Sequence, residues 1–355
     1  MIYYHDYLKL DSILGSQELE SDKHGQHAHE EMLFIITHQA FELWFKQVLF
    51  EVESVITMLS AEYVPENNVS ICQSRIRRVN RIMEHLCNQF TLIETMTPGE
   101  FMDFRAFLNP ASGFQSMQFR ILERKLGLAE DRRILKRYSD ALSDEHRRQL
   151  EEGLKGPTLF DVVQQWLENI PFMEHDGYQF WDAYRKAVSL MLENDRKEVR
   201  ALAEAEGHDA VKALEQIDAN QASFNALFDP ATYADLIASG QRRMSQKATL
   251  AVLFISSYRD QPLLQIPYRF LDAVIELDKL VSLWRYRHAM MVTRMIGMRV
   301  GTGGSSGYDY LMRTVMGQRV FDDLTSLSSY FIPKHHTPPL PTEISQRLQF
   351  VNESR

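Results

Sequence analysis

Cysteine is scarce in this chain, with only Cys72 and Cys87 among 355 residues. A disulfide framework is therefore not expected, and a reducing compartment suits the chain better than an oxidising one. The sequence also lacks CxxC and CxxCH motifs, which excludes a four-cysteine zinc site and covalent haem attachment. We predict a cytoplasmic protein.

Long apolar runs and an excess of positive charge are missing as well. No uncharged stretch is long enough to span a membrane, and the first residues show no basic region followed by an apolar segment. The 48 acidic residues outnumber the 39 basic ones, so the net charge is −9. We therefore expect neither a membrane span nor binding to nucleic acid.

Strand patterns are hard to find, and helical spacing dominates instead. We find no convincing β-hairpin signal, no useful alternating run and no fixed-period repeat. Phe34, His38, Phe41 and Phe45 follow one another at steps of four, three and four, which places them on one helical face. Helices are predicted over residues 30–59, 66–94, 158–170, 177–206, 208–227, 243–258 and 268–299.

The expected fold class is all-α, with one large helical-bundle domain over residues 1–355. Thr97, Pro98 and Glu100 have the spacing of a capped helix start. Residues from about 190 to 225 are rich in Ala, Glu, Asp and Lys, and we interpret them as a small helical appendage. Residues 333–355 begin with a Pro- and His-rich segment and are predicted to form an extended surface tail.

Twelve histidines make metal sites worth considering. An HExxH zinc motif is absent, and no histidine has a glutamate three residues before it, which removes the local signature of a di-iron bundle. The cluster of His24, His27 and His29 is flanked by glycine and charges. It is interpreted as a solvated loop.

His38 and His288 differ because each lies among large apolar residues in a strong helix. A lone histidine in such a place is usually a core residue with a hydrogen-bond partner. Two of them, one followed by the glycine- and hydroxyl-rich residues 301–307, favour the axial imidazole and apolar slot of a b-type haem protein.

Two further features allow two interpretations each. Arg105 offers a guanidinium suited to gripping a carboxylate, although a salt bridge with Asp103 also fits its position. Residues 301–307 are either a helix C-cap followed by a flexible loop or a loop that closes over a substrate and offers the Thr302 hydroxyl. A dinucleotide fingerprint is excluded, because Ser306 replaces its third glycine and the segment follows a helix.

Four blocks of sequence resemble the tryptophan 2,3-dioxygenase family. They are YHDYL with QEL (residues 4–8 and 17–19), FIITHQAFELWFKQ (34–47), PASGFQS (110–116) and GTGGSSG (301–307). The blocks keep the family's order, and the likeness extends from residue 4 to about residue 335. The resemblance implies an all-α homotetramer, a dimer of dimers, with one ferrous haem b per subunit. It also implies cleavage of the indole C2–C3 bond of L-tryptophan by O₂, giving N-formyl-L-kynurenine.

The resemblance also implies roles for particular residues. His288 is the expected axial ligand of the haem iron, and His38 the expected distal acceptor for the indole N–H. Arg105 and Thr302 are expected to hold the amino-acid end of the substrate. The remaining expected site residues are Phe34, Phe101 and Leu108 around the indole, Ser112 and Trp284 beside the haem, and Tyr4 and Tyr7 from a neighbouring subunit.

The expected N-terminal arm to that subunit spans residues 1–28. The chain departs from some bacterial members of the family at Phe101, where they carry a tyrosine, so Arg105 and Thr302 would have to hold the carboxylate without its hydroxyl. Two alternatives stay open: a related haem-dependent indole monooxygenase or peroxygenase, and a haem-binding protein without enzymatic activity.

Overall fold

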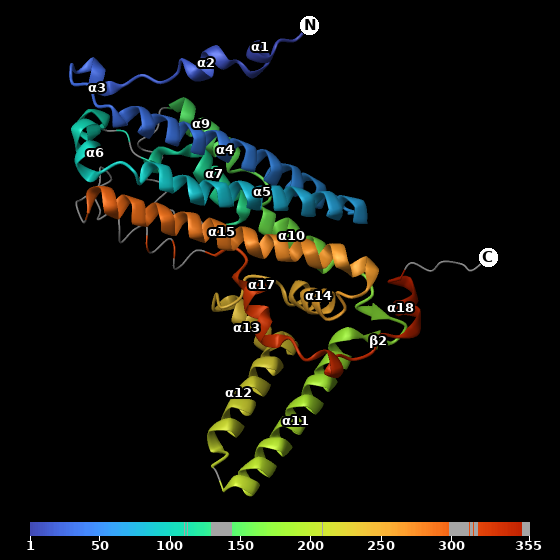
Figure 1. Ribbon diagram of the computed structural model, residues 1–355. Coiled ribbons are helices and arrows are strands. Elements are labelled where there is room, and N and C mark those ends of the chain that lie inside the picture. The colour runs from blue at the N-terminus through green and yellow to red at the C-terminus, as the bar shows by residue number, and fades with distance from the viewer. Residues whose placement is uncertain are drawn as a thin grey trace. The chain divides into compact units, whose positions relative to one another are not determined.

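Helices make up nearly all of the regular structure (Figure 1). The computed structural model of the chain describes residues 1–109, 111, 113–128, 144–207, 209–297, 312, 315 and 319–349. The prediction of an all-α fold is confirmed. None of the described helices combines the length and the apolarity that a membrane span requires.

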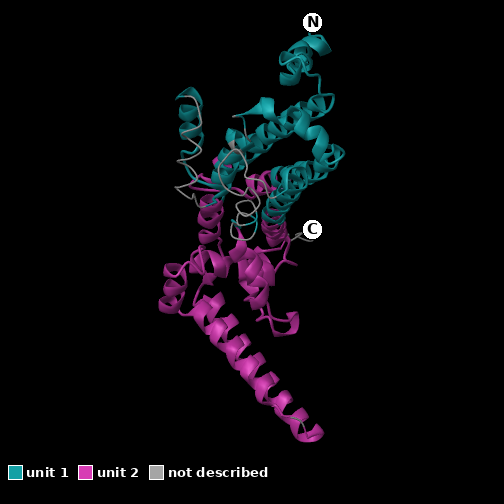
Figure 2. Cartoon of the chain, turned by 90° about the vertical axis from the view of Figure 1, so that its left-hand side faces the viewer, with its two compact units in different colours: residues 1–56, 75–159, 276–320 teal, residues 57–74, 160–275, 321–355 magenta. Residues whose placement is uncertain are grey.

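The described chain forms two compact units, each assembled from three separate stretches of sequence (Figure 2). Unit 1 comprises residues 1–56, 75–159 and 276–320, and unit 2 comprises residues 57–74, 160–275 and 321–355.

The larger parts of three long helices belong to unit 1: α4 (Glu30–Leu59) up to residue 56, α5 (Glu66–Ile93) from residue 75 and α15 (Gln265–Ile296) from residue 276. They match the predicted spans closely, because each has an apolar face that continues over many turns. Val48, Val52, Met83 and Leu86 are fully buried on α4 and α5. The amide of Gln89 on α5 donates a 3.0 Å hydrogen bond to a backbone carbonyl of α4, that of Thr37.

Shorter helices complete unit 1. They are α1 (Tyr4–Leu8), α2 (Leu10–Leu14), α3 (Glu20–Lys23), α6 (Pro98–Arg105), η1 (Ala106–Leu108), η2 (Gly113–Gln115), α7 (Met117–Leu126) and α9 (Asp144–Gly153). The predicted start of α6 is confirmed as a capping box: the Thr97 hydroxyl accepts from the Glu100 amide, and the Glu100 carboxylate accepts from the Thr97 amide.

Unit 2 is built around α14 (Gln246–Ser257), in which every residue from Ala248 to Ser256 is buried. The other described helices of this unit are α10 (Leu159–Glu168), α11 (Phe180–Glu206), α12 (Val211–Phe228), α13 (Pro230–Ala238), η3 (Pro262–Leu264), α17 (Asp322–Ser326), η4 (Leu327–Tyr330), η5 (Lys334–His336) and α18 (Thr342–Arg347). Helices α11 and α12 run side by side (Figure 1), and an ion pair of 2.8 Å joins Arg196 to Asp218 across them. The segment predicted as an appendage, residues 190–225, falls in this pair.

Two local predictions are wrong. The chain does contain a β-hairpin, in which β1 (Glu174–His175) pairs with β2 (Tyr178–Gln179). Its turn residues Asp176 and Gly177 have φ angles of 44° and 81°, the left-handed values of a type I′ turn, for which Asp-Gly is a favoured sequence. Strands of two residues are too short to produce an alternating pattern, so only the turn signals this hairpin.

The second correction concerns the tail predicted to be extended over residues 333–355. Residues 334–336 form the single turn η5, and residues 342–347 form α18. Pro341 immediately precedes the first turn of α18. Ile344 and Leu348 lie one turn apart and are fully buried, so burial of this apolar pair accounts for a helix where composition alone indicated an extended segment.

Candidate functional site

Helix α4 places Phe34 and His38 one turn apart, with ring centroids 4.1 Å apart. The His38 Nδ1 atom lies 2.7 Å from the carbonyl oxygen of Phe34. A carbonyl can only accept, so this contact assigns the proton of the neutral ring to Nδ1. The Nε2 atom of His38 is then left with a lone pair that can accept a hydrogen bond.

Helix α15 supplies a second imidazole beside an indole. Trp284 and His288 lie one turn apart, and their rings stack with centroids 5.3 Å apart. Phe41 and Phe45 of α4, Phe90 of α5 and Phe119 of α7 pack around Trp284 at 4.6–5.8 Å. These six rings, Phe41, Phe45, Phe90, Phe119, Trp284 and His288, are called the α15 aromatic cluster below.

The two imidazoles, His38 and His288, both have lowered pKa values, and the charge of His38 contributes to the shift of His288. Burial, helped by the positive charges of protonated His38 and of Arg120, lowers the pKa of His288 to about 4. Burial also lowers the pKa of His38, against the hydrogen bond to Phe34 and the charge of Glu42. Both rings are therefore neutral at pH 7, and each has a nitrogen lone pair available.

Helix α6 brings a further aromatic wall next to His38. The Phe101 ring lies 5.7 Å from Phe34, and Phe104 lies 5.4 Å from Phe101 and 5.5 Å from Phe34. Phe104 is fully buried, whereas Phe34 and Phe101 keep part of their surface exposed. The capping box described above fixes the first turn of this helix.

Arg105 is the last residue of α6 and is half-buried. Its Nη1 atom lies 4.0 Å from the sulfur of Met102, which is a weak contact. The salt bridge with Asp103 that the sequence left open does not form, and no carboxylate in the described part of the chain pairs with this guanidinium. Arg105 therefore keeps its capacity to bind an external anion.

Sequence reasoning missed a charged network near His288. Glu123 of α7 accepts from Arg120 and from Arg285 of α15, both at 2.7 Å. Arg285 is 4% exposed and Glu123 is 13% exposed in their side chains, so the pair is largely removed from water. The spacing of Arg120 and Glu123 looks like an ordinary surface pair, and nothing local links them to Arg285.

The other predicted site residues lie as follows. Leu108 is half-buried in η1, directly after α6. Tyr4 and Tyr7 lie on α1 and are 75% and 72% exposed. Ser112 and Thr302 lie outside the described residues, as does the whole loop of residues 301–307.

The cluster of His24, His27 and His29 does not form a chelating group. All three residues are exposed, as predicted. The His24 ring stacks on Phe107 with centroids 4.6 Å apart, and His27 Nδ1 lies 2.8 Å from an Asp22 oxygen.

Fold and side chains together define a class: a helical protein with two neutral imidazoles, each held among aromatic side chains and one within electrostatic range of the other. The family model described as tryptophan 2,3-dioxygenase matches residues 1–331. The tryptophan 2,3-dioxygenase of Bdellovibrio bacteriovorus is 41% identical over 352 residues, which cover 98% of each chain. This chain belongs to the tryptophan 2,3-dioxygenase family, as the four sequence blocks predicted.

Eukaryotic relatives are equally similar. The tryptophan 2,3-dioxygenase of Dictyostelium discoideum is 41% identical over 99% of this chain and 88% of its own length. Tryptophan 2,3-dioxygenase B of Danio rerio is 42% identical over 97% of this chain and 85% of its own length. The likeness therefore extends over nearly the whole chain rather than over one motif-bearing segment.

Proposed function

We propose that this protein is a haem-dependent dioxygenase that cleaves the indole C2–C3 bond of L-tryptophan with O₂ and forms N-formyl-L-kynurenine, the first step of tryptophan degradation by the kynurenine route. The observation on which the proposal rests is a pair of neutral imidazoles, each packed among aromatic side chains, in a chain of this family. Two free, buried cysteines fit a cytoplasmic enzyme.

The residues of the α15 aromatic cluster fit a haem. A flat apolar macrocycle needs aromatic walls and one neutral imidazole, and His288 stays neutral well below pH 7. The Nε1–H of Trp284 is buried and has no hydrogen-bond acceptor in the described part of the chain, which suits an acceptor group on the cofactor.

Haem b, one per subunit and ferrous in the active state, supplies the redox chemistry that activates O₂. His288 provides the lone pair that ligates the iron. Trp284 and Ser112 contribute to the cofactor's surroundings. The protein's own contribution to the reaction is then to exclude water from the apolar side and to place the indole.

Substrate binding divides into a polar end and an aromatic end. Arg105 pairs with the substrate carboxylate, and Thr302 contacts the ammonium and carboxylate groups. Phe34, Phe101 and Leu108 wall the indole ring. Because an amine without the carboxylate would leave Arg105 unpaired, this arrangement selects tryptophan over tryptamine.

His38 orients the indole. With its proton on Nδ1, held by the Phe34 carbonyl, the Nε2 lone pair accepts a hydrogen bond from the indole N–H. The contact with the Phe34 carbonyl fixes both the tautomer and the orientation of the His38 ring. The Nε2 lone pair therefore points in one defined direction, which a freely rotating histidine would not provide.

A neighbouring subunit completes the pocket. In the proposed homotetramer, a dimer of dimers, residues 1–28 form an arm that brings Tyr4 and Tyr7 to the adjacent chain. The exposure of both tyrosines within their own chain supports this role, because α1 has no buried residue.

Isotope incorporation tests the proposal. Purified protein is reconstituted with haem, reduced, and given L-tryptophan under ¹⁸O₂, and the product is weighed by mass spectrometry. The proposal predicts N-formyl-L-kynurenine that contains two heavy oxygen atoms. One heavy atom would instead support the monooxygenase or peroxygenase alternative, and a haem spectrum without consumption of tryptophan would support a haem-binding protein.

A further inference from the structure

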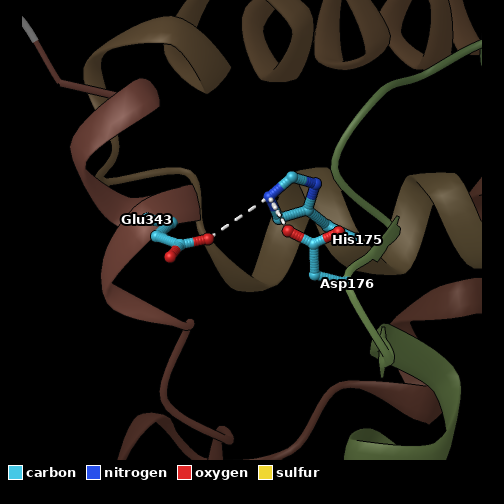
Figure 3. Close-up of side chains that lie close together, drawn as sticks. All are labelled: His175, Asp176 and Glu343. Atoms are coloured by element: carbon cyan, nitrogen blue, oxygen red, sulfur yellow. Dashed lines mark ion pairs between the residues drawn. The ribbon is translucent and has the colours of Figure 1, made fainter.

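A convergent group of metal-ligating side chains lies in unit 2, between the β-hairpin and the first turn of α18 (Figure 3). The Nε2 atom of His175 lies 3.4 Å from a carboxylate oxygen of Asp176 and 3.5 Å from a carboxylate oxygen of Glu343. The three ligand atoms lie within 4.8 Å of one another. One imidazole and two carboxylates therefore point at a common spot from segments that are far apart in sequence.

The hairpin turn is what brings Asp176 back to its neighbour. Adjacent residues in an extended strand point to opposite faces, so His175 and Asp176 would ordinarily diverge. Asp176 instead has a φ of 44°, in the left-handed region that is uncommon for a residue other than glycine. This conformation belongs to the type I′ turn, and it lets both side chains share one side of the hairpin.

Helix α18 is positioned by packing that does not involve the cluster. Ile344 and Leu348 are fully buried, and the Leu348 carbonyl accepts a 3.2 Å hydrogen bond from the Leu263 amide. Arg347, one turn after Glu343, lies over the Phe172 ring at 4.9 Å. The carboxylate of Glu343 is therefore brought to the hairpin by the fold itself, which gives a prearranged ligand set.

The distances from the His175 Nε2 atom to the two carboxylate oxygens suit shared coordination of a metal better than direct hydrogen bonds. They exceed the usual limit of about 3.2 Å for an N–H···O hydrogen bond. Zinc bonds of about 2.0–2.2 Å to nitrogen and oxygen, arranged tetrahedrally, separate neighbouring ligand atoms by about 3.4 Å. The two separations from His175 agree with that geometry. Two carboxylates that converge on one imidazole also gain from a cation between them.

We propose that His175, Asp176 and Glu343 bind one divalent transition-metal ion, with zinc the best match, and that the ion fastens α18 to the β-hairpin. An imidazole ligand favours zinc over the harder cations magnesium and calcium, which select oxygen ligands. His175 is 28% exposed in its side chain, whereas Asp176 and Glu343 are 80% and 72% exposed. The site is thus open to an entering ion and to a water molecule as fourth ligand.

Metal titration of the holoenzyme tests the proposal. The haem-loaded protein is freed of loose metal with a chelator and titrated with Zn²⁺ alone, by calorimetry, in wild type and in the variants His175→Gln and Glu343→Gln. We expect one zinc equivalent in the wild type. Each variant should bind that equivalent at least about tenfold more weakly, since even the loss of an outer-shell partner costs 10–100-fold.

Two matched variants control for charge and for other histidines. Glu174→Gln removes the same charge from the adjacent hairpin residue, which lies outside the group. His335→Gln removes an exposed imidazole that also lies outside the group. Both should keep wild-type zinc affinity. Haem absorption and circular dichroism establish that each variant is folded.

Cobalt gives a second measurement that needs no variant. Co²⁺ bound to the wild type by one nitrogen and oxygen ligands in tetrahedral geometry produces visible absorption, and Zn²⁺ should abolish it by displacement. The proposal is overturned if the wild type binds no zinc equivalent, or if His175→Gln and Glu343→Gln bind zinc as the wild type does. Cobalt absorption unaffected by zinc would overturn it equally.

Discussion

The protonation and pairing of single side chains in unit 1 depend on their surroundings. His38 and His288 are kept neutral by burial, and the Phe34 carbonyl further assigns the proton of His38 to one nitrogen. Arg105 keeps its anion-binding capacity because no described carboxylate pairs with it. An imidazole that accepts and a guanidinium that donates are the complementary groups that an indole N–H and a carboxylate require.

The decline of kcat/KM at acid pH should reflect protonation of His38. Its pKa is lowered from the usual 6.5, so the ring stays neutral as the pH falls through 6.5 and gains a proton only at lower pH. We predict that kcat/KM for L-tryptophan is constant from pH 8 to 6.5 and declines below that range. A pH profile of kcat/KM provides the measurement. An inflection above pH 6.5 that disappears in His38→Ala would contradict this assignment.

The stability of the haem-free protein should also decrease as the pH falls, because the pKa of His288 is lowered by folding. A folded-state pKa below the unfolded value means that the unfolded chain takes up protons first, so the contribution of His288 is complete above about pH 6.5 and is lost as the pH falls towards 4. Thermal unfolding of the haem-free protein between pH 7 and 4.5 should show a falling midpoint. In His288→Leu, which cannot be protonated, the midpoint should fall less steeply.

Removal of the Arg105 guanidinium should affect substrates unequally. Loss of a bidentate charge-assisted contact costs roughly 3 kcal/mol, or about a hundredfold in kcat/KM. We predict this loss in Arg105→Ala for L-tryptophan and little change for tryptamine, which lacks the carboxylate. Arg81→Ala, which removes an exposed arginine paired with Glu84, serves as the control. Comparable wild-type turnover of the two substrates would rule out this role.

Secondary-structure elements were the part of the fold most open to prediction. The long helices α4, α5, α11 and α15 were predicted to within a few residues, because an apolar face repeated over many turns is a strong signal. The β-hairpin was not predicted, although the Asp176-Gly177 pair is a favoured sequence for its type I′ turn. The helix α18 was missed because its only apolar signal is one pair of residues, Ile344 and Leu348.

The contacts between elements could not be predicted in the same way. Glu123 and Arg285 lie 162 positions apart, and no local pattern says that they meet. The aromatic contacts between α4, α5 and α15 likewise depend on how three helices pack. The sequence could identify His38 and His288 as unusual, yet it could not show that the charge of His38 acts on His288.

The link between α7 and α15 should be important for stability. Breaking a buried pair costs about 3–5 kcal/mol when one charge is left isolated. Arg120 and Arg285 have other interactions, so we expect a smaller loss, about 2 kcal/mol, in Glu123→Ala. Differential scanning calorimetry should show a midpoint lowered by several degrees. Glu84→Ala, whose partner Arg81 is exposed, should shift the midpoint little.

At the scale of the whole molecule, an exposed apolar stripe on α4 bears on the proposed assembly. Ile36, Leu43 and Phe50 follow one another at steps of seven on α4, and they are 49%, 56% and 69% exposed. A heptad stripe of apolar residues is typical of a helix that packs against a partner. Together with the exposed tyrosines of α1, this stripe supports the proposed homotetramer.

Charges placed in the α4 stripe should therefore weaken assembly. We predict that the double variant Leu43→Asp and Phe50→Asp has a lower molar mass than the wild type, measured by light scattering after size exclusion. Leu202→Asp, at an exposed apolar residue of α11 outside the stripe, should keep the wild-type mass. A double variant that is folded and as large as the wild type would exclude this face as an interface.

The absorption spectrum of His288→Ala tests the central assignment most directly. Loss of the only imidazole proposed to ligate the iron should abolish the haem spectrum and the formation of N-formyl-L-kynurenine after reconstitution and reduction. Free imidazole added to the variant should restore part of the spectrum. A His288→Ala protein with the wild-type haem spectrum and the wild-type rate would contradict the account.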